Sequence, residues 1–428
     1  MSELAALFRL AMLIAAAASV SACNGESGHG YASALRTPTG MRPVSITVEP
    51  SGRFVYVANL KSNDISAYAI DPASGALSPV PGSPFRAGTH PFALTVHPSA
   101  KLAFVANQFS NGISAYRIDA ESGALREVPG SPFPAGRRPF VVTLDEAGRF
   151  AFVANQGSDD VSVFRIDERS GALREVAGSP FKSGASPRLV TLHPSGDFAY
   201  VASSADDTVS AYRIDRSSGV LAPVPGSPFR AGRAAASVTI DASGRFAYVA
   251  NSLGDSVSGF RIDAASGALE TVPGSPFATG RFPAGVTLDP AGRTAYVANF
   301  FSATVSAFRI DTRSGALQEL PGSPFAARAT PVSVVLDPSG RFAYVANRAA
   351  NGISAFCVDA TSGALTPVGG SPFAAGSEPG SVAIDPSGRF AYVANLGSAS
   401  IASYLIDAGT GALVAPTGGV PTGGGCER

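Results

Sequence analysis

The tetrapeptide Tyr56-Val57-Ala58-Asn59 recurs every 48 residues along almost the whole chain. Its eight copies accept Phe for Tyr and Ser for Asn, but no insertion or deletion separates them. They begin at Tyr56, Phe104, Phe152, Tyr200, Tyr248, Tyr296, Tyr344 and Tyr392. A unit of this size cannot bury its hydrophobic side chains alone, so neighbouring copies must stack on one another and share a core. This repeat decides the fold.

Each copy predicts four short strands. In the fifth copy, runs rich in β-branched and aromatic residues occupy 237–240, 245–250, 256–262 and 269–272, with turn-forming sequences between them. Four-stranded antiparallel units in tandem are the blades of a β-propeller. The sequence therefore predicts an all-β fold, a single β-propeller of eight 48-residue blades. A seven-bladed ring with an extra or incomplete repeat is the alternative.

The composition agrees with this fold and excludes several classes of function. Of 428 residues, 45% are hydrophobic, and 47 Gly and 33 Pro suit short strands and tight turns rather than helices. The formal net charge is zero, which argues against a nucleic acid partner because phosphate binding needs a basic excess. No phosphate-cradling loop, metalloprotease helix or nucleophile elbow occurs, so no cofactor is expected.

The first residues read as an export signal. An apolar run follows Arg9, too short for a comfortable membrane span, and Val20-Ser21-Ala22-Cys23 resembles the lipobox of bacterial lipoproteins. We expect a signal peptide (1–22), a lipidated Cys23 with a flexible tether (23–41), the propeller (42–420) and a loose tail (421–428). The alternative is an ordinary secretory signal cut near Cys23. The expected location is the bacterial cell envelope, at the outer membrane or in the periplasm, with the lipid as the only membrane contact.

Two cysteines remain besides Cys23. Cys357 and Cys426 either pair in an oxidising compartment or stay as inert thiols.

The array begins with an inner strand and ends with an outer one from Leu413, so all eight blades should be complete. The last copy lacks the Gly-Ser-Pro-Phe ending, and residues 32–35 are expected to pair with it and reinforce the closure of the ring.

Three recurring phrases resemble a known family. They are Pro-Ser-Gly-Arg-Phe-Ala-Tyr-Val-Ala-Asn (338–347), Val-Ser-Ala-Phe-Arg-Ile-Asp (305–311), and Ser-Gly-Ala-Leu followed by Pro-Gly-Ser-Pro-Phe (314–325). They resemble YVTN-type repeats and the propeller-fold lactonases that include 6-phosphogluconolactonase. The resemblance implies a propeller and, in some members, lactone hydrolysis. The chain departs from the family in having eight copies rather than seven, and in keeping a Pro-Arg-His phrase only as Pro187-Arg188-Leu189.

The copies differ most where the chain enters the inner strand of each blade, at one mouth of the predicted channel. One column there reads Arg42, His90, Arg138, Ser186, Ala234, Phe282, Thr330 and Glu378. Arg137, Arg188, Arg233 and Arg281 flank it. Arginine forks bind carboxylate or phosphate, so Arg42, Arg137, Arg138, Arg188, Arg233 and Arg281 are the predicted anion-binding residues.

If the protein is a lactonase, His90 would be the base and Glu378 its partner, because lactone hydrolysis needs a base to activate water. The alternative is that the entrance arginines are solvated or paired with acids of neighbouring loops, namely Asp159, Asp160, Asp206, Asp207 and Asp255.

The opposite ends of the inner strands carry Glu49, His97, Asp145, His193, Asp241, Asp289, Asp337 and Asp385. These residues are interpreted as turn formers and no metal site is predicted, because ligands of one ion must converge while these lie a blade or more apart. The Asn that ends the second strand should cap the following loop. Arg117, Arg165, Arg213, Arg261 and Arg309, each two residues before an Asp, suggest a ladder of ion pairs.

Three classes of function remain open. The first is a monomeric binding or scaffold module that takes an anionic small molecule or an envelope protein at its basic entrance. The near identity of the copies favours it. The second is a lactonase acting on a sugar lactone, and the third is a structural surface protein without a ligand. Fold resemblance alone does not decide among them.

Overall fold

The computed structural model describes residues 34–416. The chain divides into two units, residues 1–31 and 32–428, and all described residues belong to the second. The predicted signal peptide, Cys23 and the tail 421–428 lie outside the described residues. Within the described part, no helix has the length and apolarity needed to cross a membrane.

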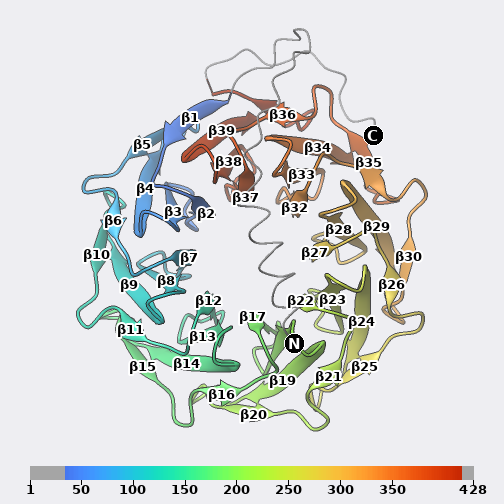
Figure 1. Ribbon diagram of the computed structural model, residues 1–428. Coiled ribbons are helices and arrows are strands. Elements are labelled where there is room, and N and C mark those ends of the chain that lie inside the picture. The colour runs from blue at the N-terminus through green and yellow to red at the C-terminus, as the bar shows by residue number, and fades with distance from the viewer. Residues whose placement is uncertain (1–33, 417–428) are drawn as a thin grey trace. The chain divides into compact units, whose positions relative to one another are not determined.

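The described residues form a closed ring of eight antiparallel blades, seen along its axis in Figure 1. This confirms the predicted eight-bladed propeller, and the seven-bladed alternative is wrong. The first blade consists of β2 (Pro43–Val48), β3 (Phe54–Asn59), β4 (Asp64–Ile70), β5 (Leu77–Pro79) and β6 (Phe85–Arg86). The second consists of β7 (Pro91–Val96), β8 (Leu102–Asn107), β9 (Gly112–Ile118), β10 (Leu125–Glu127) and β11 (Phe133–Pro134). The third consists of β12 (Pro139–Leu144), β13 (Phe150–Asn155), β14 (Asp160–Ile166), β15 (Leu173–Glu175) and β16 (Phe181–Lys182).

The remaining blades repeat this order. The fourth consists of β17 (Pro187–Leu192), β18 (Phe198–Ser203), β19 (Thr208–Ile214), β20 (Leu221–Pro223) and β21 (Phe229–Arg230). The fifth consists of β22 (Ala235–Ile240), β23 (Phe246–Asn251), β24 (Ser256–Ile262), β25 (Leu269–Thr271) and β26 (Phe277–Ala278). The sixth consists of β27 (Pro283–Leu288), β28 (Thr294–Asn299), β29 (Thr304–Ile310), β30 (Leu317–Glu319) and β31 (Phe325–Ala326). The seventh consists of β32 (Pro331–Leu336), β33 (Phe342–Asn347), β34 (Gly352–Val358), β35 (Leu365–Pro367) and β36 (Phe373–Ala374). The eighth consists of β37 (Pro379–Ile384), β38 (Phe390–Asn395), β39 (Ser400–Ile406), β40 (Leu413–Val414) and β1 (Leu35–Pro38).

The fourth strand of each blade is split into two short pieces. In the first blade, β5 and β6 both pair with β4, and the segment between them contains the cis bond Ser83–Pro84. A proline has no N–H to donate, so a continuous ladder is interrupted there. The hydroxyl of Ser83 instead accepts the N–H of Ala67 at 2.9 Å. The sequence predicted the first of these pieces and the break, but not the second piece.

The core lies between neighbouring blades, as the repeat requires. Every residue of β3 is buried, and its Phe54 and Tyr56 pack with Leu94 and Val105 of the next blade. The Tyr56 hydroxyl donates to the carbonyl of Gly123 in that blade at 2.9 Å. The same bond recurs in every blade whose copy begins with Tyr, and Tyr392 donates to Gly75 at 3.0 Å where the eighth blade meets the first.

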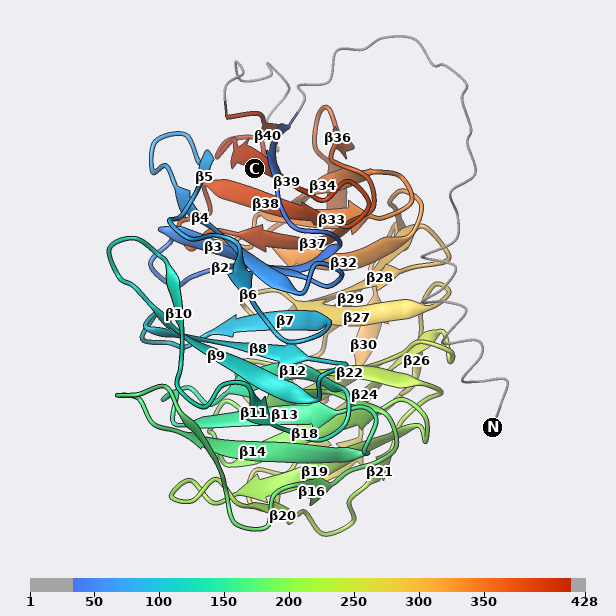
Figure 2. The same cartoon turned by 60° about the vertical axis from the view of Figure 1, so that its left-hand side comes forward.

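Strand β1 closes the ring. It pairs antiparallel with β39, from Leu35 opposite Ser403 to Pro38 opposite Ser400, and lies beside β39 in Figures 1 and 2. The expected pairing with the eighth blade is therefore present, although it involves Leu35–Pro38 rather than residues 32–35. Two expectations are corrected. The eighth blade is completed by β1 instead of being complete within the last copy, and residues 35–38 belong to the propeller instead of to a flexible tether.

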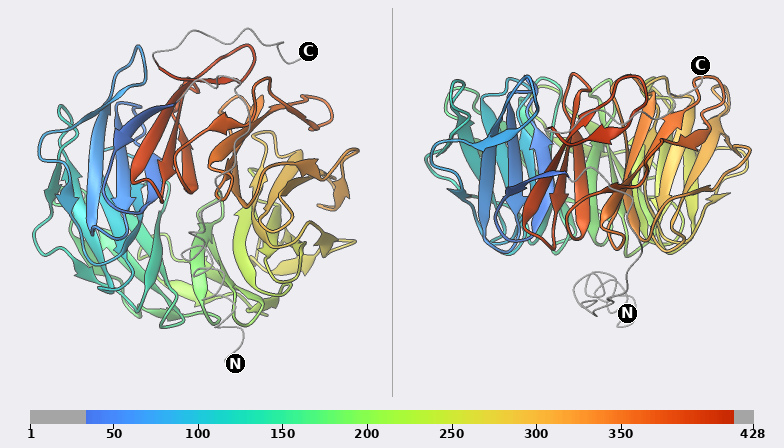
Figure 3. Two further views of the ribbon diagram at one scale, coloured as in Figure 1. Left: turned by 45° about the horizontal axis from the view of Figure 1, so that its top comes forward. Right: turned by 90° about the horizontal axis from the view of Figure 1, so that it is seen from above.

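The loops gather on two faces of the ring, which Figure 3 shows edge-on. One face holds the variable residues that precede each inner strand, and we call it the entrance face. The other holds the turns after the first and third strands of each blade, and we call it the turn face.

Cys357 lies in β34, the third strand of the seventh blade, at the position where most blades have Arg. It is disulfide-bonded. Cys23 and Cys426, the other cysteines, lie outside the described residues.

Candidate functional site

The variable column of the entrance face has an unusual backbone. All eight residues, from Arg42 to Glu378, are non-glycine residues with φ between 53° and 59°. A non-glycine residue in this left-handed region is uncommon and costs energy, so surrounding contacts must hold it there. We call these eight residues the display column.

Those contacts are hydrogen bonds that neighbouring residues make with the backbone N–H and carbonyl of the display column. The N–H of His90 donates to Asn63 Oδ1 of the preceding blade at 2.8 Å, and the N–H of Gln108 donates to the His90 carbonyl at 3.0 Å. The register of each inner strand also shifts just after this point, as a β-bulge does. The backbone is thus fixed by repeated residues while the side chain is free to vary, so the display column is where the ring can carry a specific function.

His90 is half-buried, and its ring packs on Phe109 of the same blade with 4.0 Å between ring centroids. Its Nδ1 is buried without a hydrogen-bond partner, and no hydrogen bond to its Nε2 exists within residues 34–416. Burial lowers the pKa of His90 below its ordinary value, because desolvation disfavours the imidazolium. The side chain is therefore an uncharged imidazole at neutral pH.

Glu378 has a different partner from the one predicted. Its Oε2 lies 3.1 Å from Nη2 of Arg348, which follows β33 in the seventh blade. No hydrogen bond joins Glu378 and His90, so the structure does not bring these two residues together as an acid–base pair. Sequence reasoning missed Arg348, although it is the one charged residue in its repeat column, whose other members are Leu60, Gln108, Gln156, Ser204, Ser252, Phe300 and Leu396.

The acids near the entrance do not neutralise its arginines. The carboxylates of Asp159, Asp207 and Asp255 accept the backbone N–H groups of display-column residues 186, 234 and 282, at 2.6–2.8 Å. Asp206 accepts the N–H of Ala185 at 2.8 Å, and Asp160 accepts from the Asn155 side chain at 2.7 Å.

In the described part of the chain, no carboxylate lies within salt-bridge distance of the predicted arginines, which are Arg42, Arg137, Arg138, Arg188, Arg233 and Arg281. The interpretation that they pair with these acids is wrong. Arg137, Arg138, Arg233 and Arg281 are exposed, whereas Arg42 is half-buried and its Nε has no partner.

Arg188 is the arginine that the fold places in the channel wall. Its guanidinium lies over the ring of Phe140, 5.0 Å from the centroid, and Phe140 stacks on Phe92 at 4.2 Å. The three residues hold the same position in the inner strands of adjacent blades, β17, β12 and β7. Burial lowers the pKa of Arg188, but from so high a value that it stays charged. It is a half-buried, partly desolvated cation with an aromatic neighbour and no acid.

A cavity of about 250 Å³ opens between the second and third blades on the same face. Phe109, which carries His90 on its ring, forms part of its wall together with Arg137 and Arg138. Gln108, Asn111 and Gly157 complete the lining. We call it the blade 2–3 pocket. The two unpaired guanidinium groups of this pocket can bind an anion. The imidazole of His90, which packs on the pocket residue Phe109, is a candidate proton acceptor.

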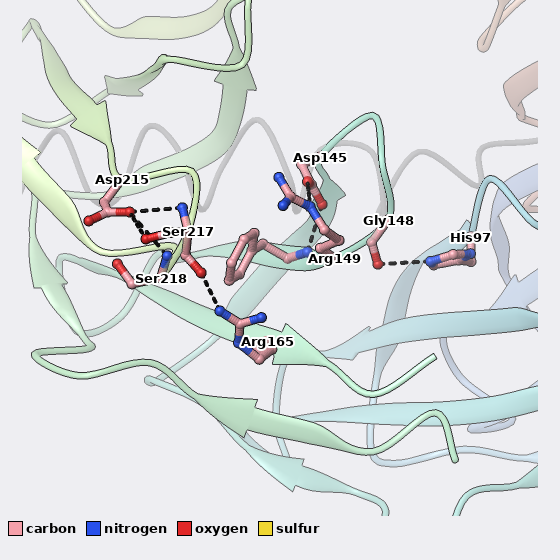
Figure 4. Close-up of polar contacts among 9 residues, drawn as sticks. His97, Asp145, Gly148, Arg149, Arg165, Asp215, Ser217 and Ser218 are labelled. Carbon is pink, nitrogen blue, oxygen red and sulfur yellow. Dashed lines mark hydrogen bonds and ion pairs between the residues drawn. The ribbon is translucent and has the colours of Figure 1, made fainter. Parts of the chain in front are cut away.

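The turn face uses its acidic and histidine side chains internally, as predicted. Asp385 Oδ1 accepts the N–H of Phe390 at 2.7 Å, and Asp241 serves Phe246 in the same way. His97 Nε2 bonds to the carbonyl of Gly148 in the next blade at 2.8 Å (Figure 4). The interpretation of these residues as turn formers is confirmed. Among residues 34–416, no group of three or more His, Cys, Asp or Glu is arranged to hold a metal ion.

The predicted ladder of ion pairs along strand three is wrong. Arg165 donates to the Ser217 carbonyl of the next blade (Figure 4), and its guanidinium lies 4.8 Å from the ring centroid of Phe150. The acids that follow these arginines are occupied by their own turns, as Asp215 is by the N–H of Ser217 at 2.8 Å. The strand-two Asn does more than the predicted capping of the following loop. Asn107 Nδ2 donates to the carbonyl of Gly112, where that loop ends, at 3.2 Å, and its Oδ1 accepts the N–H of Gly88, in the loop before the inner strand, at 3.1 Å.

Comparison with known proteins gives a family and several structural neighbours. The family model of the seven-bladed β-propeller lactonases matches residues 31–137, 130–333 and 318–425. No curated protein matches the chain. A candidate 6-phosphogluconolactonase of Bacteroides fragilis is 21% identical and has a TM-score of 0.59, over 82% of this chain and 97% of that one.

Two further solved structures are similar. The periplasmic gluconolactonase of Pseudomonas aeruginosa is 23% identical with a TM-score of 0.55, over 67% of this chain and 86% of that one. Sqt1 of Chaetomium thermophilum is 12% identical with a TM-score of 0.67, over 88% of this chain and 100% of that one. At these identities the structural matches establish the propeller fold and nothing finer.

Proposed function

Since the chain belongs to the family of β-propeller lactonases, we propose that it hydrolyses a lactone that carries an acidic group. The observation that carries this proposal is the blade 2–3 pocket, whose wall holds Phe109 and the unpaired guanidinium groups of Arg137 and Arg138. His90, whose pKa is lowered by burial, packs on Phe109. The chain has one blade more than the family description, so the proposal rests on these residues rather than on positions in other members.

The chemistry needs few groups. A lactone is opened when water attacks its carbonyl carbon and one proton of the water passes to a base. The ring C–O bond then breaks, and the protonated base returns the proton to the ring oxygen, which leaves as a hydroxyl while the acid product forms. The imidazole of His90 can accept that proton because it is uncharged at neutral pH. A guanidinium of Arg137 or Arg138 can stabilise the negative charge that develops on the carbonyl oxygen. Glu378 is held by Arg348 and has no part in this step.

Three observations support an acidic substrate. The entrance arginines have no carboxylate partner within the described residues, so an anion would meet unneutralised charge. Arg188 adds a desolvated cation on the channel wall, where an electrostatic interaction is stronger than in water. Two of the structural neighbours are described as lactonases of gluconate-type sugars, one of them a 6-phosphogluconolactonase. A sugar lactone with a carboxylate or phosphate is therefore the substrate class that we propose.

The test is lactone hydrolysis by the purified protein, beginning at Asn24, with each lactone corrected for its spontaneous hydrolysis. We expect turnover of phosphorylated or carboxylated sugar lactones and little turnover of neutral ones. His90→Asn, which suits a left-handed backbone, should lower kcat by about 100-fold or more. Ser186→Ala, at the same repeat position in the fourth blade, is the control and should leave the rate unchanged.

The pH profile gives a second readout. Only the uncharged imidazole can act as the base, and its pKa lies below 6.5. The rate should therefore rise with pH, reach half its maximum below pH 6.5 and be level at neutral pH. Turnover that survives His90→Asn, or a rate that still climbs above pH 7, would exclude His90 as the base.

A binding module for an anionic ligand is the second candidate, and one observation favours it. Glu378 pairs with Arg348 rather than with His90, so no hydrogen-bonded carboxylate–imidazole pair is assembled at the entrance. In this case no lactone would be turned over, while 6-phosphogluconate would bind with an affinity that falls on Arg138→Gln. The neighbour Sqt1 also binds the N-terminus of the ribosomal protein L10 in one structure, which shows that a ring of this fold can hold a peptide.

We also propose that the protein is exported and anchored to the bacterial envelope through a lipid on Cys23. The lipobox-like sequence before Cys23 supports this. Labelling of cells with a radioactive fatty acid should mark the wild-type protein and not Cys23→Ala. Equal labelling of both would show that Cys23 is not the attachment site.

A further inference from the structure

One residue position at the start of the second strand of each blade is filled by a large apolar side chain in all blades but one. The column reads Phe54, Leu102, Phe150, Phe198, Phe246, Thr294, Phe342 and Phe390. Thr294, in the sixth blade, is small and polar. This column lies near the turn face, on the side of the ring opposite the blade 2–3 pocket, so it is independent of the site proposed above.

The fifth blade shows what the phenylalanine does in an intact copy. Phe246 is buried and packs against the turn glycine Gly315 of the sixth blade, which has no side chain that would clash. The guanidinium groups of Arg245 and Arg261 lie over its ring, at 5.3 and 5.8 Å from the centroid. In the third blade, Arg149 and Arg165 lie over Phe150 at 5.6 and 4.8 Å. An intact copy thus holds one benzene ring among two arginines and a glycine turn.

The sixth blade keeps these neighbours and lacks the ring. Arg293 and Arg309 stand at the two arginine positions, and Gly363 of the seventh blade provides the turn. Beside Thr294 lies an open cavity of about 330 Å³, lined by both arginines, Gly363 and Arg341. Two other cavities on this face, of about 180 and 480 Å³, have Phe150 and Phe246 in their walls. What distinguishes the cavity at Thr294 is therefore its lining, not its size.

The charge of this cavity favours an anion. The acids in its wall serve their own turns, since Asp289 Oδ1 accepts the N–H of Thr294 at 2.7 Å and Asp359 Oδ1 accepts that of Ser362 at 2.6 Å. No ion pair engages Arg293, Arg309 or Arg341 within the described residues. Arg293 and Arg309 make only long bonds to backbone carbonyls, at 3.5 and 3.3 Å. Most of their N–H groups are available to a ligand.

We propose that this cavity binds a small aromatic acid. Its ring takes the place of the absent phenylalanine, between the faces of Arg293 and Arg309, and its carboxylate meets the guanidinium groups that the wall acids leave unpaired. Two kinds of interaction act together here, the attraction of arginines to a ring face and charge-assisted hydrogen bonds to a carboxylate. A free aromatic molecule can occupy the space left where an aromatic side chain is missing, as benzene does in an engineered apolar cavity.

Isothermal titration of the purified protein with benzoate tests the proposal without any enzymatic readout. We expect one benzoate to bind per chain. Thr294→Phe restores the side chain of the other blades and should weaken binding by at least about tenfold. Phe246→Thr removes the ring between Arg245 and Arg261 and should create a second benzoate site in the fifth blade. Because Phe246→Thr should add a site where Thr294→Phe should weaken one, the test does not depend on a single substitution.

Three outcomes would contradict the proposal. Absence of benzoate binding to the wild-type protein would overturn the proposal, as would equal binding to wild type and to a folded Thr294→Phe. Cyclohexanecarboxylate carries the same charge on a non-aromatic ring and should bind at least about tenfold more weakly. If it binds as well as benzoate, the arginines do not recognise an aromatic ring and the proposal fails.

Discussion

The two faces of the ring use the same kinds of side chain in opposite ways. On the turn face, carboxylates and histidines are bound to neighbouring backbone groups, as Asp385 is to the N–H of Phe390 and His97 is to the carbonyl of Gly148. On the entrance face, the backbone of the display column is held by Asn and Asp side chains, while His90, Arg138 and Glu378 project from it. Carboxylates and histidines thus stabilise turns on the turn face, whereas His90 and Arg138 on the entrance face are available to a ligand.

This difference shows where a repeat protein can change its sequence without losing its fold. A substitution on the turn face removes hydrogen bonds that the fold requires. A substitution in the display column leaves these backbone hydrogen bonds intact, because in most blades their acceptors are Asn and Asp side chains of the preceding blade. The strongly repeated face is therefore expected to determine stability, and the variable face to determine specificity. Four experiments test this division.

Acid should unfold the ring through the turn face. Each third-strand turn begins with an Asp whose pKa is lowered by hydrogen bonds from its own turn; these are Asp71, Asp119, Asp167, Asp215, Asp263, Asp311, Asp359 and Asp407. A lowered pKa stabilises the fold above the ordinary value of 3.8, and this contribution is lost as pH falls through the folded-state pKa. Circular dichroism should show full folding at pH 5 and cooperative loss below about pH 4. Loss of structure near pH 6 would point to the histidines instead.

The second experiment compares one acid from each face of the eighth blade. Asp385 is buried and accepts hydrogen bonds from Phe390 N–H, at 2.7 Å, and from the N–H and hydroxyl of Ser387. Asp385→Ala should lower the free energy of unfolding by about 2–3 kcal/mol, because buried donors lose their acceptor. Glu378→Ala should cost less than about 1 kcal/mol, since the Arg348–Glu378 pair is partly exposed. Chemical denaturation of both variants measures the difference, and equal losses would contradict the division of the faces.

The third experiment changes one arginine on each side. Arg188→Met keeps the side-chain length and contact with Phe140 but removes the charge from the channel wall. It should weaken binding of 6-phosphogluconate by roughly tenfold, about 1.4 kcal/mol, and leave Tm unchanged or higher because a desolvated charge is gone. Arg216→Met is the control, since Arg216 is exposed on the turn face, 3.8 Å from Asp197. A Tm that falls in Arg188→Met with unchanged affinity would make Arg188 a structural residue.

The smallest effect concerns the scaffold beneath the display column. In the fourth blade, Ser203 replaces the buried Asn of other blades, and its hydroxyl has no hydrogen-bond partner. In the fifth blade the corresponding Asn251 bonds to Ser258 Oγ at 2.9 Å and accepts the N–H of Gly232 at 3.0 Å. Ser203→Asn should supply the same bonds and raise the free energy of unfolding by about 1 kcal/mol. Lactone turnover should not change, because no display-column side chain is altered.

Much of this architecture could be predicted from the sequence because the repeat presents each structural rule eight times. The strand positions of the fifth copy agree with the structure within two residues, from β22 to β25. The turn carboxylates were recognised because Asp before Pro-Ser-Gly has a local role that needs no knowledge of the fold. Strand β1 also had a signal that was missed. Shifted by 48 residues, Gly40 and Pro43 align with Gly88 and Pro91, which places Pro38 where Arg86 ends β6.

The partners of side chains were not predictable in the same way. The Arg348–Glu378 pair joins two blades across 30 residues, and only the packed ring shows that these residues meet. The arginine ladder was misread for a related reason. Arg165 and Asp167 are close in sequence, but the carboxylate of Asp167 bonds to the N–H of Ser170, and the arginine reaches the next blade instead. The cavity at Thr294 had a sequence signal, the single break in a column of large apolar residues, whose meaning depended on the arginines around it.

Strand β1 has a consequence for the order in which this protein can be built. The hydrogen bond from Arg36 to the carbonyl of Ala375 spans 339 residues, and β1 has no partner until β39 has been synthesised. During synthesis from the N-terminus, the seven earlier blades can form in succession, each on its predecessor. The eighth blade needs both β1 and β39. Because these strands are so far apart in the sequence, their pairing is expected to be the slowest step and the last to occur. Until then the part of β39 that β1 covers, residues 400–403, presents an unpaired strand edge, and a nascent or truncated chain is most exposed to aggregation there.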